Sequence, residues 1–147
     1  MSDQQSPRTA ADYNMTLQRI PYAQFLGISI AAHEDDFITR MAFTEKLIGN
    51  PVLPALHGGV IGAFLEMTAL IQLVIETQPL KLPKPVDITI DYLRTGRPMD
   101  TFGRATITRH GRRVANVQAV AWQNDPDRPI AMAHGHFLLK VDEKTSR

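Results

Sequence analysis

Residues 56–67 have the sequence Leu56-His57-Gly58-Gly59-Val60-Ile61-Gly62-Ala63-Phe64-Leu65-Glu66-Met67, and this stretch decides how the rest of the chain is interpreted. Two adjacent glycines open an apolar segment, and one carboxylate follows about two helical turns later. The first amides of a helix have no partner inside it, so they can bind a developing negative charge. Glu66 is the only formally charged residue between Lys46 and Glu76. We therefore interpret the stretch as an oxyanion site, formed by the Gly58 and Gly59 amides, together with a base.

The apolar segment predicts one long helix over residues 57–77, because Pro79, Pro83 and Pro85 prevent its continuation. The helix is apolar on nearly all sides, so we expect it to be buried on most sides. Its length approaches that of a membrane span, but the stretch contains Glu66 and Gln72, which would be costly in lipid. We therefore expect a soluble protein.

Extended segments flank this helix. Two precede it and four follow, at residues 26–31, 37–43, 86–94, 101–109, 112–122 and 129–141. Strands separated from a single helix in this way predict an α+β fold, in which an antiparallel sheet of about six strands wraps around the helix. We expect residues 1–15 to form a flexible tail and residues 16–147 to form one domain.

The composition excludes several classes of function. The chain has 147 residues, of which 44% are hydrophobic and 21% charged, and its net charge of +1 gives no case for binding nucleic acid or an acidic membrane. The absence of cysteine excludes disulfides, thiolate metal sites and a cysteine nucleophile. No metal is expected, and a cytoplasmic location fits this composition.

The spacing between the glycines and the acid predicts a dimer. Glu66 lies seven or eight residues beyond Gly58 and Gly59, a distance of about 11 Å at a rise of 1.5 Å per residue. A glutamate side chain does not cover that span well enough to attack a carbonyl held at the helix start. We expect a two-fold homodimer in which each site takes amides from one subunit and Glu66 from the other. Two such dimers could join as a tetramer.

The order of elements and the His57-Gly58-Gly59…Glu66 spacing resemble the hotdog-fold acyl-CoA thioesterases, in particular the phenylacetate-pathway and 4-hydroxybenzoyl-CoA group. Further marks of the resemblance are Asn50-Pro51, the strand segment 87–94 and the hairpin segment 109–113. The resemblance implies hydrolysis of the thioester of a small, aromatic or medium-chain acyl-CoA, with coenzyme A as part of the substrate and no other cofactor.

The resemblance also implies roles for individual residues. Glu66 is the general base or nucleophile, the Gly58 amide with Gly59 beside it polarises the thioester carbonyl, and Asn50 positions water or substrate. His57 has two open interpretations, a hydrogen bond to the asparagine loop or the thioester, and a structural role. 

Arginines form a second candidate site. Arg109, Arg112 and Arg113 surround a turn, and Arg94 lies on a neighbouring connection with Arg97. Arginine forks suit the phosphates of coenzyme A, whereas the alternative is an ordinary solvated hairpin.

Two other functions remain open at this point. One is a hotdog-fold hydratase or dehydratase that acts on acyl thioesters, and the other is a non-catalytic acyl-CoA-binding protein on the same scaffold. Hydration of an enoyl thioester would remove the enoyl absorbance without releasing a thiol, so the two enzymes can be told apart.

Overall fold

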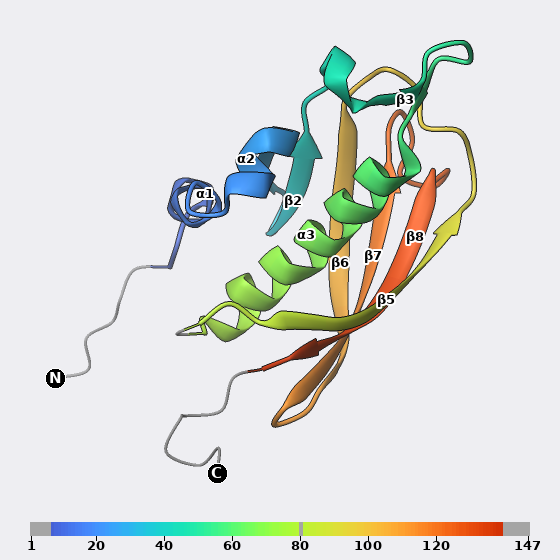
Figure 1. Cartoon of the computed structure of the whole chain (residues 1–147). Helices are drawn as coiled ribbons and strands as arrows, with labels where there is room; N and C mark the ends of the chain where they lie inside the picture. The colour runs from blue at the N-terminus through green and yellow to red at the C-terminus, as the bar shows by residue number, and fades with distance from the viewer. Residues whose placement is uncertain (1–6, 80, 140–147) are drawn as a thin grey trace, which may run out of the picture.

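The structure is a computed structural model and describes residues 7–79 and 81–139. One antiparallel sheet curves around one long helix, as expected for the predicted fold class (Figure 1). The helix is α3 (Gly58–Thr77), and the main sheet consists of β1 (Ile28–His33), β2 (Asp36–Met41), β5 (Lys84–Tyr92), β6 (Thr101–His110), β7 (Val114–Trp122) and β8 (Ala131–Leu138).

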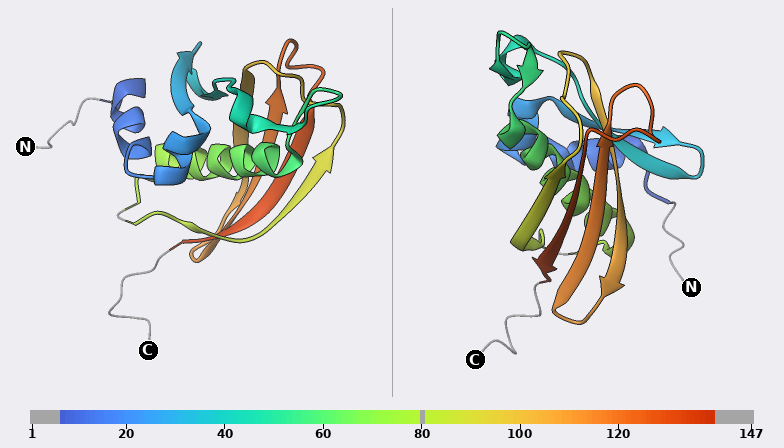
Figure 2. Two further views of the ribbon diagram at one scale, coloured as in Figure 1. Left: turned by 45° about the horizontal axis from the view of Figure 1, so that its top comes forward. Right: turned by 90° about the vertical axis from the view of Figure 1, so that its right-hand side faces the viewer.

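The six strands of the main sheet lie in the order β1-β2-β6-β7-β8-β5, and every neighbouring pair is antiparallel. The long hairpins β6–β7 and β7–β8 form its centre, and β5 returns from the end of α3 to pair with β8. Figure 2 shows α3 packed on one face of this curved sheet. The predicted segments were therefore right in number and type, with bounds shifted by up to three residues.

The helix α3 forms the centre of the core because apolar residues surround it. Phe64, Leu65 and Leu73 have no exposed surface, and Phe137 on β8 is equally buried. Among the described residues, α3 is the helix whose length and mean hydropathy of 1.8 would suit a membrane span, but 61% of its most apolar stretch is buried inside the protein. The helix ends where Gln78 adopts a left-handed conformation with φ 47°, followed by Pro79.

The two edges of the sheet differ. At the β1 edge, Asn14 on α1 (Ala10–Leu17) donates to the Ile30 carbonyl at 2.9 Å and accepts from the Ile30 amide at 2.8 Å, as a neighbouring strand would. At the other edge, β5 pairs with β8 on one side, and no described strand pairs with its outer side. Val86 and Leu93 at this edge are 63% and 47% exposed. Open strand edges are the usual place for pairing with another chain.

The expected flexible tail needs a correction, because α1 begins at Ala10. A capping box between Thr9 and Asp12 starts the helix, and the hydrogen bonds from Thr9 hold the pKa of the Asp12 carboxyl below its usual range. Tyr13 and Leu17 are buried in the core. The helix α2 (Pro21–Leu26) follows with proline in its first turn. The first six residues of the predicted tail lie outside the described residues.

The segment before α3 contains more regular structure than its prolines suggest. A 3-10 turn, η1 (Glu45–Leu47), leads into a small ribbon of β3 (Ile48–Asn50) and β4 (Ala55–Leu56). Gly49 is required in this ribbon because a Cβ there would lie 2.6 Å from the His57 Cα. The β3–β4 ribbon therefore lies directly against His57, the residue that precedes α3.

Candidate active site

The start of α3 is shaped by His57, which caps the helix. Its Nδ1 accepts a hydrogen bond from the Gly59 amide at 2.9 Å, and its carbonyl accepts from the Val60 and Ile61 amides. The prediction that both glycine amides are uncovered was therefore wrong for Gly59. The Gly58 amide has no hydrogen-bond acceptor among the described residues, so it is the helix-start donor that a substrate can use.

The cap also fixes the tautomer of the His57 ring. A neutral imidazole that accepts at Nδ1 carries its proton on Nε2. The His57 side chain is exposed, and Nε2 has no partner among the described residues. The ring can thus donate one hydrogen bond from Nε2 in addition to the one that it accepts at Nδ1. A structural role and a role in substrate binding are therefore compatible for His57. Its Nδ1 caps the helix, whereas its Nε2 remains available for a hydrogen bond to another group.

Tyr92 is a residue of this site that the sequence interpretation missed. Its hydroxyl donates to the Gly58 carbonyl at 2.7 Å, and a Cβ at Gly62 would lie 2.6 Å from the Ile90 Cδ1. Small residues in the first turns of α3 therefore let the end of β5 approach the helix. The alternation of Ile88, Ile90 and Tyr92 along the strand was the signal that could have found this contact.

Glu66 lies two turns further along α3 on its half-buried side, next to Ala63 and Met67. It makes no hydrogen bond or ion pair with any residue in the ranges 7–79 and 81–139. A structural role as the partner of a buried arginine therefore has no support in this part of the chain. The continuous helix Gly58–Thr77 keeps Glu66 and the Gly58 amide of one chain apart, as the spacing predicts.

Asn50 is the last residue of β3, in the ribbon that precedes α3, and its oxygen has a local role. The Asn50 Oδ1 accepts from the amides of Val52 at 3.0 Å and Leu53 at 3.3 Å. The side-chain oxygen thus closes a turn, which is common for asparagine. The Nδ2 group is the part of Asn50 that remains to contact water or substrate.

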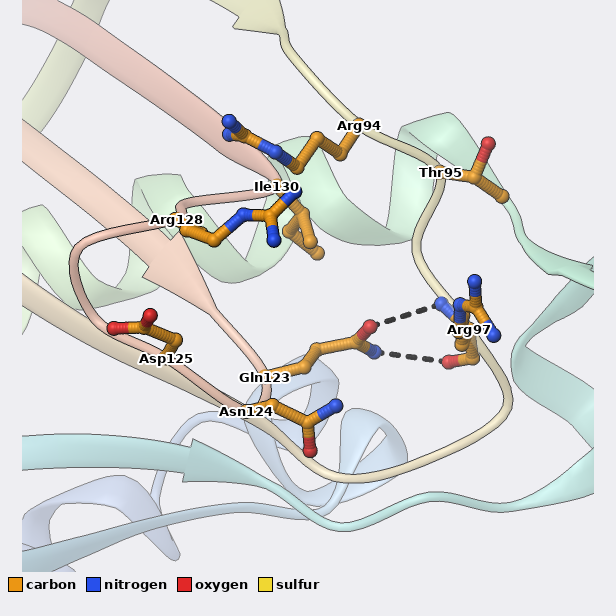
Figure 3. Close-up of a pocket in the computed structure, with 8 residues that line it drawn as sticks. All are labelled: Arg94, Thr95, Arg97, Gln123, Asn124, Asp125, Arg128 and Ile130. Carbon is orange, nitrogen blue, oxygen red and sulfur yellow. Dashed lines mark hydrogen bonds between the residues drawn. The ribbon is translucent and has the colours of Figure 1, made fainter.

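The predicted arginine site separates into two groups. Arg109, Arg112 and Arg113 belong to the β6–β7 hairpin, whereas Arg94 lies after β5, near the start of α3 (Figure 1). These places are at opposite ends of β6, whose ten residues span about 30 Å. The two groups of arginines are therefore on successive connections of the chain but do not lie together within one chain. Arg94 instead lines a pocket with Arg97 and Arg128 (Figure 3).

Asp87 and His136 form a side-chain pair on the face of the sheet turned away from α3. His136 Nδ1 is 2.7 Å from Asp87 Oδ1, and this hydrogen bond holds the pKa of the Asp87 carboxyl below its usual range. The carboxylate also accepts from the His136 amide at a bulge between β5 and β8. No group of three metal-ligating side chains is found among the described residues. The Asp87–His136 pair joins β5 to β8.

One long helix inside a curved antiparallel sheet of six strands is the hotdog fold, which defines the structural class of this protein. The family model for the acyl-CoA thioesterase N-terminal domain matches residues 50–141, and the chain belongs to that family. 

The chain is also similar to individual proteins. The medium/long-chain acyl-CoA thioesterase YigI of Escherichia coli is 28% identical over 140 residues, which cover 85% of this chain and 89% of YigI. A crystal structure of a Chromobacterium violaceum protein is 38% identical, with a TM-score of 0.72, and the match covers 90% of this chain and 93% of the other. A Bacillus halodurans protein crystallised with CoA has the same fold, with a TM-score of 0.74, 19% identity and coverage of 91% and 90%.

Proposed function

We propose that this acyl-CoA thioesterase uses Glu66 as its base and the Gly58 amide as its oxyanion donor. The observation that carries the proposal is that both groups lie on one helix and neither has a partner among the described residues. The Gly58 amide and the half-exposed Glu66 carboxylate are therefore both available to contact water or a substrate.

The proposed reaction is hydrolysis by activated water. Glu66 takes a proton from water, and the resulting hydroxide adds to the thioester carbonyl carbon. The carbonyl oxygen becomes an oxyanion that accepts hydrogen bonds from the Gly58 amide and from His57 Nε2. Collapse of this intermediate breaks the carbon–sulfur bond and releases the CoA thiolate, which recovers the proton from Glu66. In the alternative, Glu66 attacks the carbonyl carbon and displaces the CoA thiolate, and water then hydrolyses the resulting mixed anhydride.

The proposal requires two copies of the chain. Because Glu66 and Gly58 of one chain are about 12 Å apart along the helix, each site combines Gly58 of one subunit with Glu66 of its partner. The open β5 edge, with exposed Val86 and Leu93, supports pairing with a second copy, whereas the β1 edge is already occupied by Asn14. We also propose that two such dimers form a tetramer. The proposed location is the cytoplasm.

The substrate is proposed to be a medium-chain acyl-CoA. The name of YigI, which specifies medium and long acyl chains, supports this choice. That Arg109, Arg112 and Arg113 also contact coenzyme A stays a prediction.

The test is thiol release from a series of acyl-CoAs by the wild type and Glu66→Gln. A positioned base contributes about 10²- to 10⁴-fold to the rate, so we expect the glutamine variant to lose activity by that factor while its size and unfolding curve are unchanged. Crotonyl-CoA is included in the series, because loss of the enoyl absorbance without thiol release would favour a hydratase. Full thiol release by Glu66→Gln would contradict the assignment.

A further inference from the structure

A pocket of about 710 Å³ lies between the loop that joins β5 to β6 and the turn that joins β7 to β8. The loop contributes Arg94, Thr95 and Arg97, and the turn contributes Gln123, Asn124, Asp125 and Arg128. Figure 3 shows Arg94 and Arg128 on one wall and Arg97 on the other. A volume of this size is in the range of small-molecule sites, and polar side chains line most of this one.

The pocket carries an excess of positive charge. The lining includes three arginines and one carboxylate, that of Asp125, whose Oδ1 accepts from the Asp127 amide at 2.9 Å inside its own turn. Arg94 donates to the Pro129 carbonyl at 2.8 Å, and the side chains of Arg97 and Arg128 form no ion pair with any described residue. Like charges held around one hollow repel one another, and an anion placed between them removes this repulsion.

The backbone that carries these arginines is held in place before any ligand arrives. The Gln123 side chain is 8% exposed, and its amide accepts from the Arg97 amide at 3.0 Å and donates to the Arg97 carbonyl at 2.9 Å. At the end of the loop, Asp100 accepts from the Phe43 amide and from Arg40, and these hydrogen bonds lower the pKa of its carboxyl. A preformed site of this kind costs little ordering on binding.

The same loop touches the start of the active-site helix. The Leu56 amide donates to the Gly96 carbonyl at 2.9 Å, and a Cβ at Gly96 would lie 3.1 Å from the Ile61 Cδ1. One side of the loop thus contacts the first turn of α3 and the other side forms the pocket. A molecule with its reacting group at Gly58 and an anionic group at some distance from it could occupy both places.

We infer that this pocket binds a phosphate of the CoA nucleotide through Arg94, Arg97 and Arg128, while the pantetheine arm reaches past the loop to the helix start. The inference rests on the proposed function. Guanidinium forks bind phosphate oxygens with two parallel hydrogen bonds, which a lysine cannot do. The bound group is either the 3′-phosphate or the diphosphate of coenzyme A, because both present the same chemistry to the three arginines.

The test compares Arg97→Ala and Arg128→Ala with Arg19→Ala, a control that removes an exposed arginine outside the pocket. Loss of one charged hydrogen bond at an exposed site predicts that each pocket variant raises KM for acyl-CoA by about five- to tenfold, with kcat unchanged. The matching acyl-N-acetylcysteamine thioester, which lacks phosphate, keeps its KM. An acyl-dephospho-CoA separates the sources: if the variants still raise its KM, the pocket holds the diphosphate, and if they do not, it holds the 3′-phosphate.

Three outcomes would overturn the inference. These are an unchanged KM for acyl-CoA, an equal loss on the thioester that lacks phosphate, and a selective rise in KM in Arg112→Ala instead of the pocket variants. Calorimetric binding of CoA itself separates this inference from the proposed function. If no thioester is hydrolysed but Arg128→Ala still weakens CoA binding, the pocket assignment holds and the proposed function fails.

Discussion

The two halves of α3 differ in how their polar groups are satisfied. In the second half, Thr68 Oγ1 lies 2.7 Å from Thr39 Oγ1 and donates to the Phe64 carbonyl, and Gln72 donates to Glu76 at 2.8 Å. In the first half, the Gly58 amide and the Glu66 carboxylate have no partner among the described residues. The polar groups of the second half are therefore satisfied within the chain, whereas the Gly58 amide and the Glu66 carboxylate are available to groups from outside it.

After Glu66→Gln, the largest effect in this comparison is expected from Gly58→Pro, which removes the free amide. Proline is tolerated at the first helical position, and His57 already has the extended conformation, φ −64° and ψ 132°, that a following proline requires. Losing one oxyanion donor costs about 3 kcal/mol of barrier, so we expect kcat in the thiol-release assay to fall by about 10²-fold.

Gly58→Ala is the matched control for this variant, because it keeps the amide. Its Cβ would lie 3.4 Å from the Tyr92 hydroxyl, which is ordinary contact. We expect this variant to remain close to wild type. If Gly58→Pro is folded and as active as Gly58→Ala, the amide plays no part in the reaction.

A smaller effect, of a different kind, is expected in the second half of the helix. Thr68 is 2% exposed, and Thr68→Val leaves the Thr39 hydroxyl without its acceptor inside the core. An unsatisfied buried hydroxyl costs about 1–3 kcal/mol, which should appear as a lower free energy of unfolding in urea at a fixed protein concentration. Thr68→Ser keeps the hydroxyl and should recover much of this loss.

The kcat of folded Thr68→Val should stay near that of the wild type. A drop in its kcat with no change in stability would mean that the two halves of the helix are not divided between catalysis and core as described above.

The elements of the fold could be predicted from the sequence, because local patterns determine them. Alternation along residues 86–94, the prolines after Thr77 and the glycine pair at the helix start each indicate an element without knowledge of its neighbours. The β1 edge could not be predicted in this way. The contact between Asn14 and Ile30 joins residues 16 positions apart, and nothing in the pattern around Asn14 indicates it.

The candidate site was only partly predictable for the same reason. Glu66 could be identified because it is a lone charge in an apolar helix. The hydrogen bond from the Gly59 amide to His57 depends on the orientation of the imidazole ring, which the sequence does not specify. The grouping of Arg94 with Arg128 depends on which strand ends lie next to each other. Chain order places Arg94 nearer to the hairpin arginines than to Arg128, whereas the antiparallel sheet places it at the opposite end from them.

The most direct test of shared sites is to mix Glu66→Gln with Gly58→Pro subunits after dissociation and reassembly. With random pairing, half of the dimers are mixed, and each mixed dimer has one site with both an intact amide and an intact carboxylate, so about one quarter of the wild-type activity should return. Activity no higher than that of the separate variants, in a sample shown to contain mixed dimers, would contradict a site built from Gly58 of one subunit and Glu66 of the other.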